Sequence, residues 1–387
     1  MKRSHLLALL LAVPTALVPA AGTALAADQA APPRLVSVEQ APDHRAIDGS
    51  YIVTLKPGAS AKGLAEKAGI DTGHVYEDVL NGFSAELSDG QLAKLRSHPA
   101  VQAIEEDQKI TASATQYNAT WGLDRIDQRN RPLDGTYTYN NDGSRVTAYI
   151  IDTGIDTSHP DFGNRARNVF DAFGGNGRDC NGHGTHVAGT VGGKTYGVAK
   201  NVELRGVRVL NCQGSGSYSG IIAGFDWVRE NAVKPAVANA SLGGGYSSAV
   251  NNAASALNDS GVFLAVAAGN SNADACNYSP ASARGVISIA ASDSSDRKAS
   301  FSNYGRCTDL FAPGVSITST RMGGGTTQLS GTSMASPHVA GVAALYKGSR
   351  GDASSSTINN WLISNATTNV ISNPAGTPNR LLYKSTL

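Results

Sequence analysis

The chain has 387 residues, of which 41% are hydrophobic and 16% are charged, and its formal net charge is +1. This length allows one large domain or two smaller ones. The near-neutral charge gives no support for a nucleic-acid partner, and we expect none. The 43 glycines, many of them in short clusters, indicate a loop-rich α/β protein.

The N-terminus has the three parts of a secretory signal peptide. Lys2 and Arg3 supply positive charge, residues 6–18 form an apolar run, and residues 24–26 are a small-x-small cleavage site. The apolar run is short for a membrane span, and no other run in the chain is long enough. We therefore expect residues 1–26 to be removed and the protein to be secreted to the extracellular side, without a membrane partner. An uncleaved anchor is the alternative.

The next segment predicts a small α+β unit. Residues 27–50 are rich in Ala, Pro and polar groups and predict a flexible lead. Beyond them, strands are predicted at 51–58, 74–80, 82–87 and 101–110, and helices at 61–69 and 88–97. A unit of about sixty residues is near the lower size limit for stability without help. Residues 27–113 carry 8 Lys+Arg against 13 Asp+Glu, whereas residues 114–387 carry 22 against 18, so opposite charge favours their docking.

From residue 114 onward, apolar strands alternate with helices. Strands are predicted at 146–151, 202–210, 236–242, 262–268 and 286–291, and helices at 184–192, 218–231 and 247–260. This alternation indicates a mostly parallel sheet with helices on both faces. In such sheets ligands bind at the carboxyl ends of the strands. Asp152 and Asn270 each follow an apolar strand closely and are therefore placed at that edge.

The stretch 331–341 places a serine at the start of a helix. Pro337 has no N–H group to donate and is tolerated only near a helix start, so Ser333 lies at or just inside the N-terminus. Unpaired N–H groups and the helix dipole favour negative charge there. That position suits a nucleophile whose attack creates an oxyanion. A serine that only caps the helix is the alternative.

A second informative stretch, 180–189, brings two histidines and a cysteine together. Cys180, His183 and His186 could contribute to a zinc site, since zinc takes Cys and His ligands. No second Cys/His cluster supplies a fourth ligand, and the set fails if Cys180 is in a disulfide. The other interpretation is that one histidine is a general base.

The residues singled out so far fill the roles of an acyl-transfer site. Such a site needs a nucleophile, a base, and a carboxylate that orients the base, and Ser333, His183 and Asp152 supply these groups. It also needs donors for the oxyanion. The side chain of Asn270 and the backbone N–H of Ser333 could donate.

The motifs around these residues resemble those of a known family. Four separated motifs match the subtilase family in identity and order: Asp152-Thr153-Gly154, His183-Gly184-Thr185-His186-Val187-Ala188-Gly189, Ala267-Ala268-Gly269-Asn270 and Gly331-Thr332-Ser333-Met334-Ala335. Residues 114–127 and 378–383 are further similar to the proteinase K branch, and most similar to its aqualysin group. The resemblance covers essentially all of residues 114–387.

The resemblance implies a fold and an activity. The fold would be subtilisin-like α/β, a mostly parallel sheet flanked by helices, preceded by a small α+β inhibitory propeptide. The propeptide would span 27–113, with its inhibitor-type domain at about 51–111, and the peptidase domain 114–387. The activity would be that of a serine endopeptidase in which Ser333 attacks, His183 accepts the proton, Asp152 orients His183, and Asn270 holds the oxyanion.

The resemblance also implies how substrates bind. Two glycine-rich edges would hold proteins and peptides as an added strand: Gly214, Ser215, Gly216 and Tyr218 on one, and Ser241, Leu242, Gly243 and Gly244 on the other. Self-cleavage is expected between Ser113 and Ala114, after which the propeptide inhibits its own enzyme. The residues before that cut, 110–113, are small or apolar apart from their hydroxyls, so we hypothesise a broad specificity that tolerates such residues.

Disulfides and a metal complete the expectations. The four cysteines allow three pairings that spacing alone does not separate. The resemblance implies Cys180–Cys212 and Cys276–Cys307. It also implies a structural calcium ion held by Asp309 and by the carbonyls of Arg284 and Val286.

We expect a monomer. Two other functions remain open from the residues alone: a catalytically silent binding module with this fold, and an exported esterase that uses the same triad.

Overall fold

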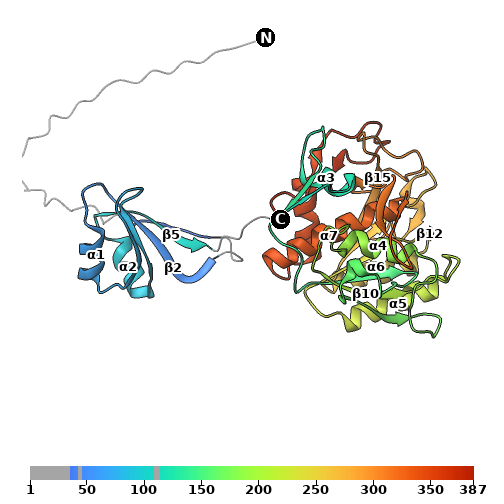
Figure 1. The fold of residues 1–387 in the computed structure, drawn as a ribbon, viewed down its shortest axis with the longest axis horizontal. Helices are drawn as coiled ribbons and strands as arrows, with labels where there is room; N and C mark the ends of the chain where they lie inside the picture. Colours follow the sequence, from blue (N-terminus) through green and yellow to red (C-terminus); the bar gives the residue numbers. More distant parts are fainter. Residues whose placement is uncertain (1–34, 42–45, 109–113) are drawn as a thin grey trace, which may run out of the picture. The chain divides into compact units, whose positions relative to one another are not determined.

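The computed structural model describes residues 35–41, 46–108 and 114–387. These residues form two compact units, a smaller one of residues 35–41 and 47–107 and a larger one that contains residues 114–387 (Figure 1). The expected signal peptide lies outside the described residues, and so does Ser113 at the expected cleavage point.

The smaller unit is a five-stranded sheet with two helices. The strand order is β1-β5-β2-β4-β3. Its elements are β1 (Val38–Glu39), β2 (Ala46–Leu55), α1 (Ala61–Ala68), β3 (Thr72–Tyr76), β4 (Gly82–Glu86), α2 (Asp89–Arg96) and β5 (Val101–Gln108). The prediction of a flexible lead up to residue 50 is wrong in part. Residues 38–39 pair in parallel with β5, and β2 begins four residues before position 50.

The larger unit contains a nine-stranded sheet in the order β19-β20-β16-β15-β13-β11-β8-β10-β9. The strands are β8 (Thr147–Asp152), β9 (Ala166–Asp171), β10 (Glu203–Arg208), β11 (Ala236–Ala240), β13 (Phe263–Ala267), β15 (Ile287–Ser292), β16 (Leu310–Pro313), β19 (Thr367–Thr368) and β20 (Arg380–Leu381). Every pairing is parallel except that of β19 with β20. The prediction of a mostly parallel sheet is confirmed.

Helices cover both faces of this sheet. They are α3 (Trp121–Asp127), α4 (His183–Gly192), α5 (Tyr218–Asn231), α6 (Ser248–Asp259), α7 (Thr332–Arg350) and α8 (Ser355–Asn365), with short 3-10 turns η1 (Pro160–Phe162) and η2 (Ala275–Asn277). Ala148 and Ile150 of β8 pack in one core with α4 and α7, whereas Tyr149 and Ile151 pack in the other with α5 and α6. Successive side chains of a strand point to opposite faces, so residues 148–151 of β8 are all apolar because both faces of the strand are covered.

Three short antiparallel pairs of strands complete the described part of the larger unit, and none of them was expected from the sequence. They are β6 (Ala114–Tyr117) with β7 (Thr136–Tyr139), β12 (Gly244–Gly245) with β14 (Tyr278–Ser279), and β17 (Ile317–Thr320) with β18 (Thr326–Leu329). The last pair leads directly into the residues before Ser333. None of the helices in the described ranges is long and apolar enough to cross a membrane.

Candidate active site

Asp152 and His183 meet at the carboxyl edge of the sheet. Asp152 is the last residue of β8 and is fully buried, and His183 is the first residue of α4. Oδ1 of Asp152 lies 2.7 Å from Nδ1 of His183 and also accepts the N–H of Thr153 at 2.7 Å. The imidazole is therefore held through Nδ1, and its side chain remains 25% exposed.

The surroundings of His183 favour its protonated form. Burial opposes protonation, but the charge of Asp152, the hydrogen bond that His183 donates to Asp152 and the charge of Asp179 outweigh it and raise the pKa of His183 above 6.5. A raised pKa makes the neutral imidazole a stronger base toward a nearby hydroxyl.

A buried carboxylate that no motif had singled out shapes the loop before α4. Oδ1 of Asp179 accepts the hydroxyl of Thr153 and the N–H groups of Asn181 and Gly182, each at 2.9 Å. Its Oδ2 accepts the N–H of Thr185 at 3.0 Å and the hydroxyl at 2.5 Å. Gly182 has a φ of 101°, a conformation that favours glycine. These contacts fix the direction in which α4 begins.

Ser333 is the second residue of α7, as the position of Pro337 predicted. Its hydroxyl donates to the carbonyl of Ser241 at 3.2 Å, and the Ser241 hydroxyl donates to the Ser333 carbonyl at 2.7 Å. In a regular helix that carbonyl would accept the N–H four residues later, which Pro337 lacks. Ser241 therefore satisfies the acceptor that the proline leaves free.

The hydrogen bonds among the described residues include none between Ser333 and His183. Both side chains nevertheless line the same cavity, of about 570 Å³. In enzymes without substrate this bond is often long and tightens only in the reactive complex.

Asn270 follows β13 and is held by the residue before Ser333. Its Oδ1 accepts the N–H of Thr332 at 2.8 Å and the hydroxyl at 2.9 Å. The same hydroxyl accepts the N–H of Gly269 at 3.1 Å. Because the amide oxygen is bound on one side, the NH₂ group points the other way. It lies 3.5 Å from where a Cβ on Gly331 would be, beside the start of α7.

All eight residues predicted to bind peptide line the 570 Å³ cavity. They are Gly214, Ser215, Gly216, Tyr218, Ser241, Leu242, Gly243 and Gly244. The hydroxyl of Tyr218 donates to the carbonyl of Gly245 at 2.8 Å and so connects the two glycine-rich edges. We call this cavity the cleft.

A second cavity, of about 200 Å³, adjoins the cleft and contains no charged side chain. Its lining is Leu242, Gly243, Gly244, Gly245, Ala267, Ala268, Gly269, Asn270, Ser271, Tyr278, Ser279, Ala281, Thr332 and Ser333. It therefore suits a small or apolar side chain next to the serine hydroxyl.

The zinc interpretation of Cys180, His183 and His186 fails. Cys180 is bonded to Cys212, so its thiolate is not available. Nε2 of His186 lies 2.9 Å from the carbonyl of Ile317, and burial lowers the pKa of His186 to about 4. His186 is a neutral structural residue that joins α4 to β17. No group of three or more metal-binding side chains occurs in the part of the chain that the structure describes.

The structure contains the two disulfides that the resemblance implied. Cys180–Cys212 spans 32 residues with a Cα–Cα distance of 4.8 Å, and it joins the loop before α4 to one edge of the cleft. Cys276–Cys307 spans 31 residues with a Cα–Cα distance of 5.2 Å and joins η2 to the segment before β16.

The three expected calcium ligands lie where β15 and β16 begin. The N–H of Asp309 donates to the carbonyl of Ser288 at 2.9 Å, and its Oδ2 accepts the Ser288 N–H at 2.7 Å. The Asp309 carboxylate therefore lies beside β15, the strand that begins directly after Val286. Burial raises the pKa of Asp309. The hydrogen bond from the Ser288 N–H and the charge of Arg380 lower this pKa, but they offset the effect of burial only in part. A neighbouring cation would favour the ionised form.

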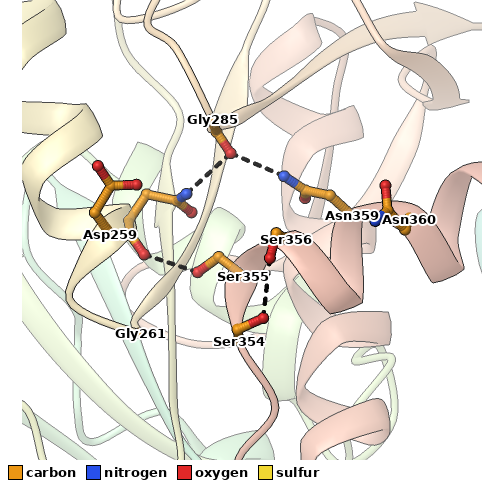
Figure 2. A pocket seen from close by; sticks show the side chains of 9 residues that line it. Asp259, Gly261, Gly285, Ser354, Ser355, Ser356, Asn359 and Asn360 are labelled. Atoms are coloured by element: carbon orange, nitrogen blue, oxygen red, sulfur yellow. Dashed lines mark hydrogen bonds between the residues drawn. The ribbon is translucent and has the colours of Figure 1, made fainter.

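The carbonyl groups of residues 284 and 285, directly before β15, accept hydrogen bonds from side chains of neighbouring segments (Figure 2). The carbonyl of Arg284 accepts the hydroxyl of Ser255 at 2.8 Å. The carbonyl of Gly285 accepts the side-chain amides of Asn258 and Asn359 at 2.9 and 2.8 Å, beside a polar cavity of about 300 Å³. A carbonyl oxygen has two lone pairs, so Arg284 can still face a cation. One carboxylate with carbonyl oxygens is a donor set that fits calcium.

Comparison with known proteins identifies the family. The model of the Subtilase family matches residues 143–381, and that of Peptidase inhibitor I9 matches residues 50–113. Alkaline serine exoprotease A of Vibrio alginolyticus is 52% identical over 320 residues, which cover 81% of this chain and 60% of the relative. Extracellular serine proteinase of Thermus sp. (strain Rt41A) is 50% identical over 368 residues, which cover 87% of this chain and 90% of the relative.

A solved structure shows the same fold. It is a cold adapted subtilisin-like serine proteinase with 54% sequence identity and a TM-score of 0.68, and the match covers 69% of this chain and 98% of that chain. The family match spans more than half of the chain and agrees with the relatives across both units. The chain therefore belongs to the subtilase family, and it is a subtilisin-like serine protease that carries an I9 propeptide.

Proposed function

We propose that the chain is a secreted serine endopeptidase of broad specificity that removes its own propeptide. The observation that carries this proposal is the 2.7 Å contact between Asp152 and His183, together with the cavity that His183 and Ser333 both line. Export is supported by the signal-like residues 1–26 and by a relative whose name describes it as extracellular.

Each residue of the proposed active site has a separate role in peptide hydrolysis. The Ser333 hydroxyl turns from the Ser241 carbonyl toward Nε2 of His183 and attacks the peptide carbonyl, while His183 takes the hydroxyl proton. Asp152 keeps the proton on Nδ1 and stabilises the imidazolium. His183 then gives its proton to the leaving amine, and water repeats the sequence on the acyl-enzyme. Nδ2 of Asn270 and the N–H of Ser333 hold the oxyanion.

The cleft supports a broad specificity. The backbone of its two glycine-rich edges binds an extended peptide whatever its side chains are. The uncharged 200 Å³ cavity next to Ser333 has no partner for Arg or Lys and admits small and apolar side chains. A strict preference for Arg or Lys before the cut, measured by mass spectrometry of peptides from a denatured protein, would contradict this part of the proposal.

The chain is proposed to mature in two cuts. Residues 1–26 are removed on export, and residues 27–113 are released by self-cleavage between Ser113 and Ala114, which leaves residues 114–387 as the enzyme. The I9 match over residues 50–113 supports an inhibitor that is part of the same polypeptide.

One experiment tests the mechanism and its alternatives. Wild type and Ser333→Ala are assayed on casein and on a small ester, and the N-terminus of each product is read by mass spectrometry. We expect wild type to cleave casein and to begin at Ala114, and Ser333→Ala to do neither. Equal casein cleavage by both would overturn the mechanism. Cleavage of the ester alone would favour an esterase, and no turnover of either a binding module.

We also propose a structural calcium ion at Asp309, with the carbonyls of Arg284 and Val286 as its other protein ligands. When bound, the ion links the segments that open β15 and β16. Addition of EGTA should then lower the Tm of the inactive Ser333→Ala variant. The same variant with Asp309→Asn should start at a lower Tm and respond less. An equal response to EGTA in both proteins would place the calcium elsewhere.

A further inference from the structure

A surface pocket outside the cleft is lined by residues that lie between Asp152 and His183 in the chain. It has a volume of about 430 Å³ and shares no lining residue with the cleft or with the 200 Å³ cavity. Arg167 and Arg178 line it, together with the polar side chains of Asp156, Ser158, Asn168 and Asn176. We call it the arginine pocket.

The arginine pocket carries an excess of positive charge. Arg167 and Arg178 are exposed, and no carboxylate of the described residues lies within 4.0 Å of either guanidinium. Asp156 is the carboxylate in the lining, and its oxygens are already bound. Oδ1 accepts the Ser158 hydroxyl at 2.6 Å, and Oδ2 accepts the N–H of Gly323 at 2.8 Å. Two guanidinium groups therefore face one occupied carboxylate.

Of the two amide side chains in the lining, Asn176 offers a donor to a ligand and neither offers an acceptor that is not already bonded. Asn168 uses both of its polar atoms on the backbone of Ile155, at 2.9 and 2.8 Å. Oδ1 of Asn176 accepts the N–H of Arg178 at 3.1 Å, which leaves its NH₂ group to donate. A planar guanidinium matches a carboxylate with two parallel hydrogen bonds. The chemistry of the pocket therefore selects an anion, and a carboxylate in particular.

A continuous set of contacts leads from the catalytic histidine to this pocket. The tip of the β17–β18 hairpin stands next to the residue before His183, because a Cβ on Gly182 would lie 3.7 Å from Cβ of Met322. The next residue of the tip, Gly323, is bound by Asp156 of the pocket. The hairpin tip thus contacts both the residue before His183 and the arginine pocket.

The positions of the cleft and the 200 Å³ cavity indicate on which side of His183 a bound substrate continues after the scissile bond. The glycine-rich edges and the 200 Å³ cavity hold the part of the substrate before the scissile bond, if the proposed function is right. No residue of the hairpin tip lines either cavity. The segment after the scissile bond would then pass His183 on a side that neither cavity occupies, and the hairpin tip and the arginine pocket both lie outside these cavities.

We propose that the arginine pocket binds an acidic side chain of the substrate segment that follows the scissile bond, and so favours cleavage ahead of acidic sequences. This inference rests on the proposed function and adds a preference to it. The ligand is a Glu or Asp carboxylate carried by the polypeptide substrate.

The test uses internally quenched peptides with one constant sequence before the cut. After the cut, a single Glu, Gln or Lys is moved through the second to the sixth position, which covers about 16 Å of extended chain. We expect kcat/KM with Glu to exceed that with Gln by about fivefold at one or two of these positions. The advantage should disappear at about 1 M NaCl, because the screening length is then about 3 Å.

Substitutions of the two arginines test whether the preference for Glu over Gln arises in the arginine pocket. Arg167→Gln and Arg178→Gln should each lower the ratio of kcat/KM for Glu over Gln, and Arg178→Glu should favour Lys. The matched control is Arg229→Gln, which removes the same charge from exposed α5 and should leave the ratio unchanged. A general disturbance of folding changes all kcat/KM values together and does not move this ratio.

The outcomes separate the two proposals. If wild type cleaves none of the peptides, the proposed function fails. If wild type cleaves them but treats Glu and Gln alike at every position, only the arginine pocket is overturned. A Glu preference that survives in both pocket variants, or that falls equally in Arg229→Gln, also overturns it.

Discussion

Thr332 shows how a residue beside Ser333, the proposed nucleophile, can set the orientation of an amide. Its N–H and its hydroxyl both donate to Oδ1 of Asn270, so the amide has one satisfied oxygen and one free NH₂ group. Reversing the amide would place its NH₂ group against the Thr332 N–H, which can only donate. The orientation needed for an oxyanion donor therefore follows from the hydrogen bonds of Thr332.

We predict that Thr332→Val lowers kcat with little change in KM. Valine keeps the shape but loses the hydroxyl that holds Asn270 and Gly269, so the donor is no longer aimed, which should cost about tenfold in kcat. Steady-state kinetics on one peptide measure this. Thr326→Val, on the exposed β18, is the control and should retain activity. An unchanged kcat in Thr332→Val would contradict the role given to Thr332.

The sequence pointed to the residues that lie in motifs and missed one that does not. Ser333, His183 and Asp152 were proposed as catalytic because acyl transfer requires those three residue types and the family motifs surround them. Asp179 was not found, although it holds the loop before α4. Its bonds to the N–H groups two and three residues later are a turn pattern that Asp favours, and this local signal was available.

Among the elements, α7 shows how a proline can be kept inside a helix. Pro337 is the sixth residue of α7 and supplies no N–H to the carbonyl of Ser333. The hydroxyl of Ser241, from the segment after β11, donates to that carbonyl instead. The start of the helix is thereby fixed to one edge of the cleft.

We predict that Ser241→Ala destabilises the protein by about 1–3 kcal/mol, because the Ser333 carbonyl loses its donor. Pro337→Ala restores an N–H at the position where a helix normally supplies one. The double variant should therefore lose less stability than the two single losses added together. Urea unfolding of the four proteins, each in the inactive Ser333→Ala background, measures the difference. Strict additivity would show that Ser241 does not replace the missing N–H.

The long elements could be predicted from the sequence and the short ones could not. Residues 148–151 of β8 and all of β13 are apolar because they are buried on both faces, and this pattern is visible without a structure. β17 and β18 are rich in Thr and Ser and have no apolar period. They form because Ser319 and Thr320 donate to carbonyls of α4 at 2.9 and 2.7 Å, a tertiary contact that no local pattern encodes.

For the whole molecule, two buried histidines should set the response to acid. Burial lowers the pKa of His186 and of His338 to about 4, compared with 6.5 in an unfolded chain. The unfolded chain therefore takes up protons between pH 6.5 and 4 while the folded protein does not. Stability from these residues is complete above pH 6.5 and is lost as the pH falls toward 4, by about 3 kcal/mol for each histidine.

We predict that His338→Gln removes about half of this acid sensitivity, since Gln carries no charge and can still donate to the Met334 carbonyl that His338 contacts at 2.8 Å. Urea unfolding of the Ser333→Ala protein with and without His338→Gln, between pH 7 and 4, measures it. Curves that stay parallel over this range would show that His338 does not contribute.

The division into two units could be predicted from the change of pattern near residue 114, but the cysteine pairing could not. Three pairings are equally compatible with the spacing, and only the resemblance favoured one. The fold decides between them by bringing Cys180 to Cys212 and Cys276 to Cys307 within 5.2 Å, measured between Cα atoms.

The disulfide between Cys180 and Cys212 has a consequence for a protease that shares its solution with other copies of itself. The chain between these cysteines includes an exposed turn at Lys194 and Thr195, where another molecule could cut. A nick there would leave both pieces covalently joined, with His183 on one and the Gly214 edge on the other. Autolysis at this turn would therefore leave one intact particle, and two fragments would separate only after the bond is reduced.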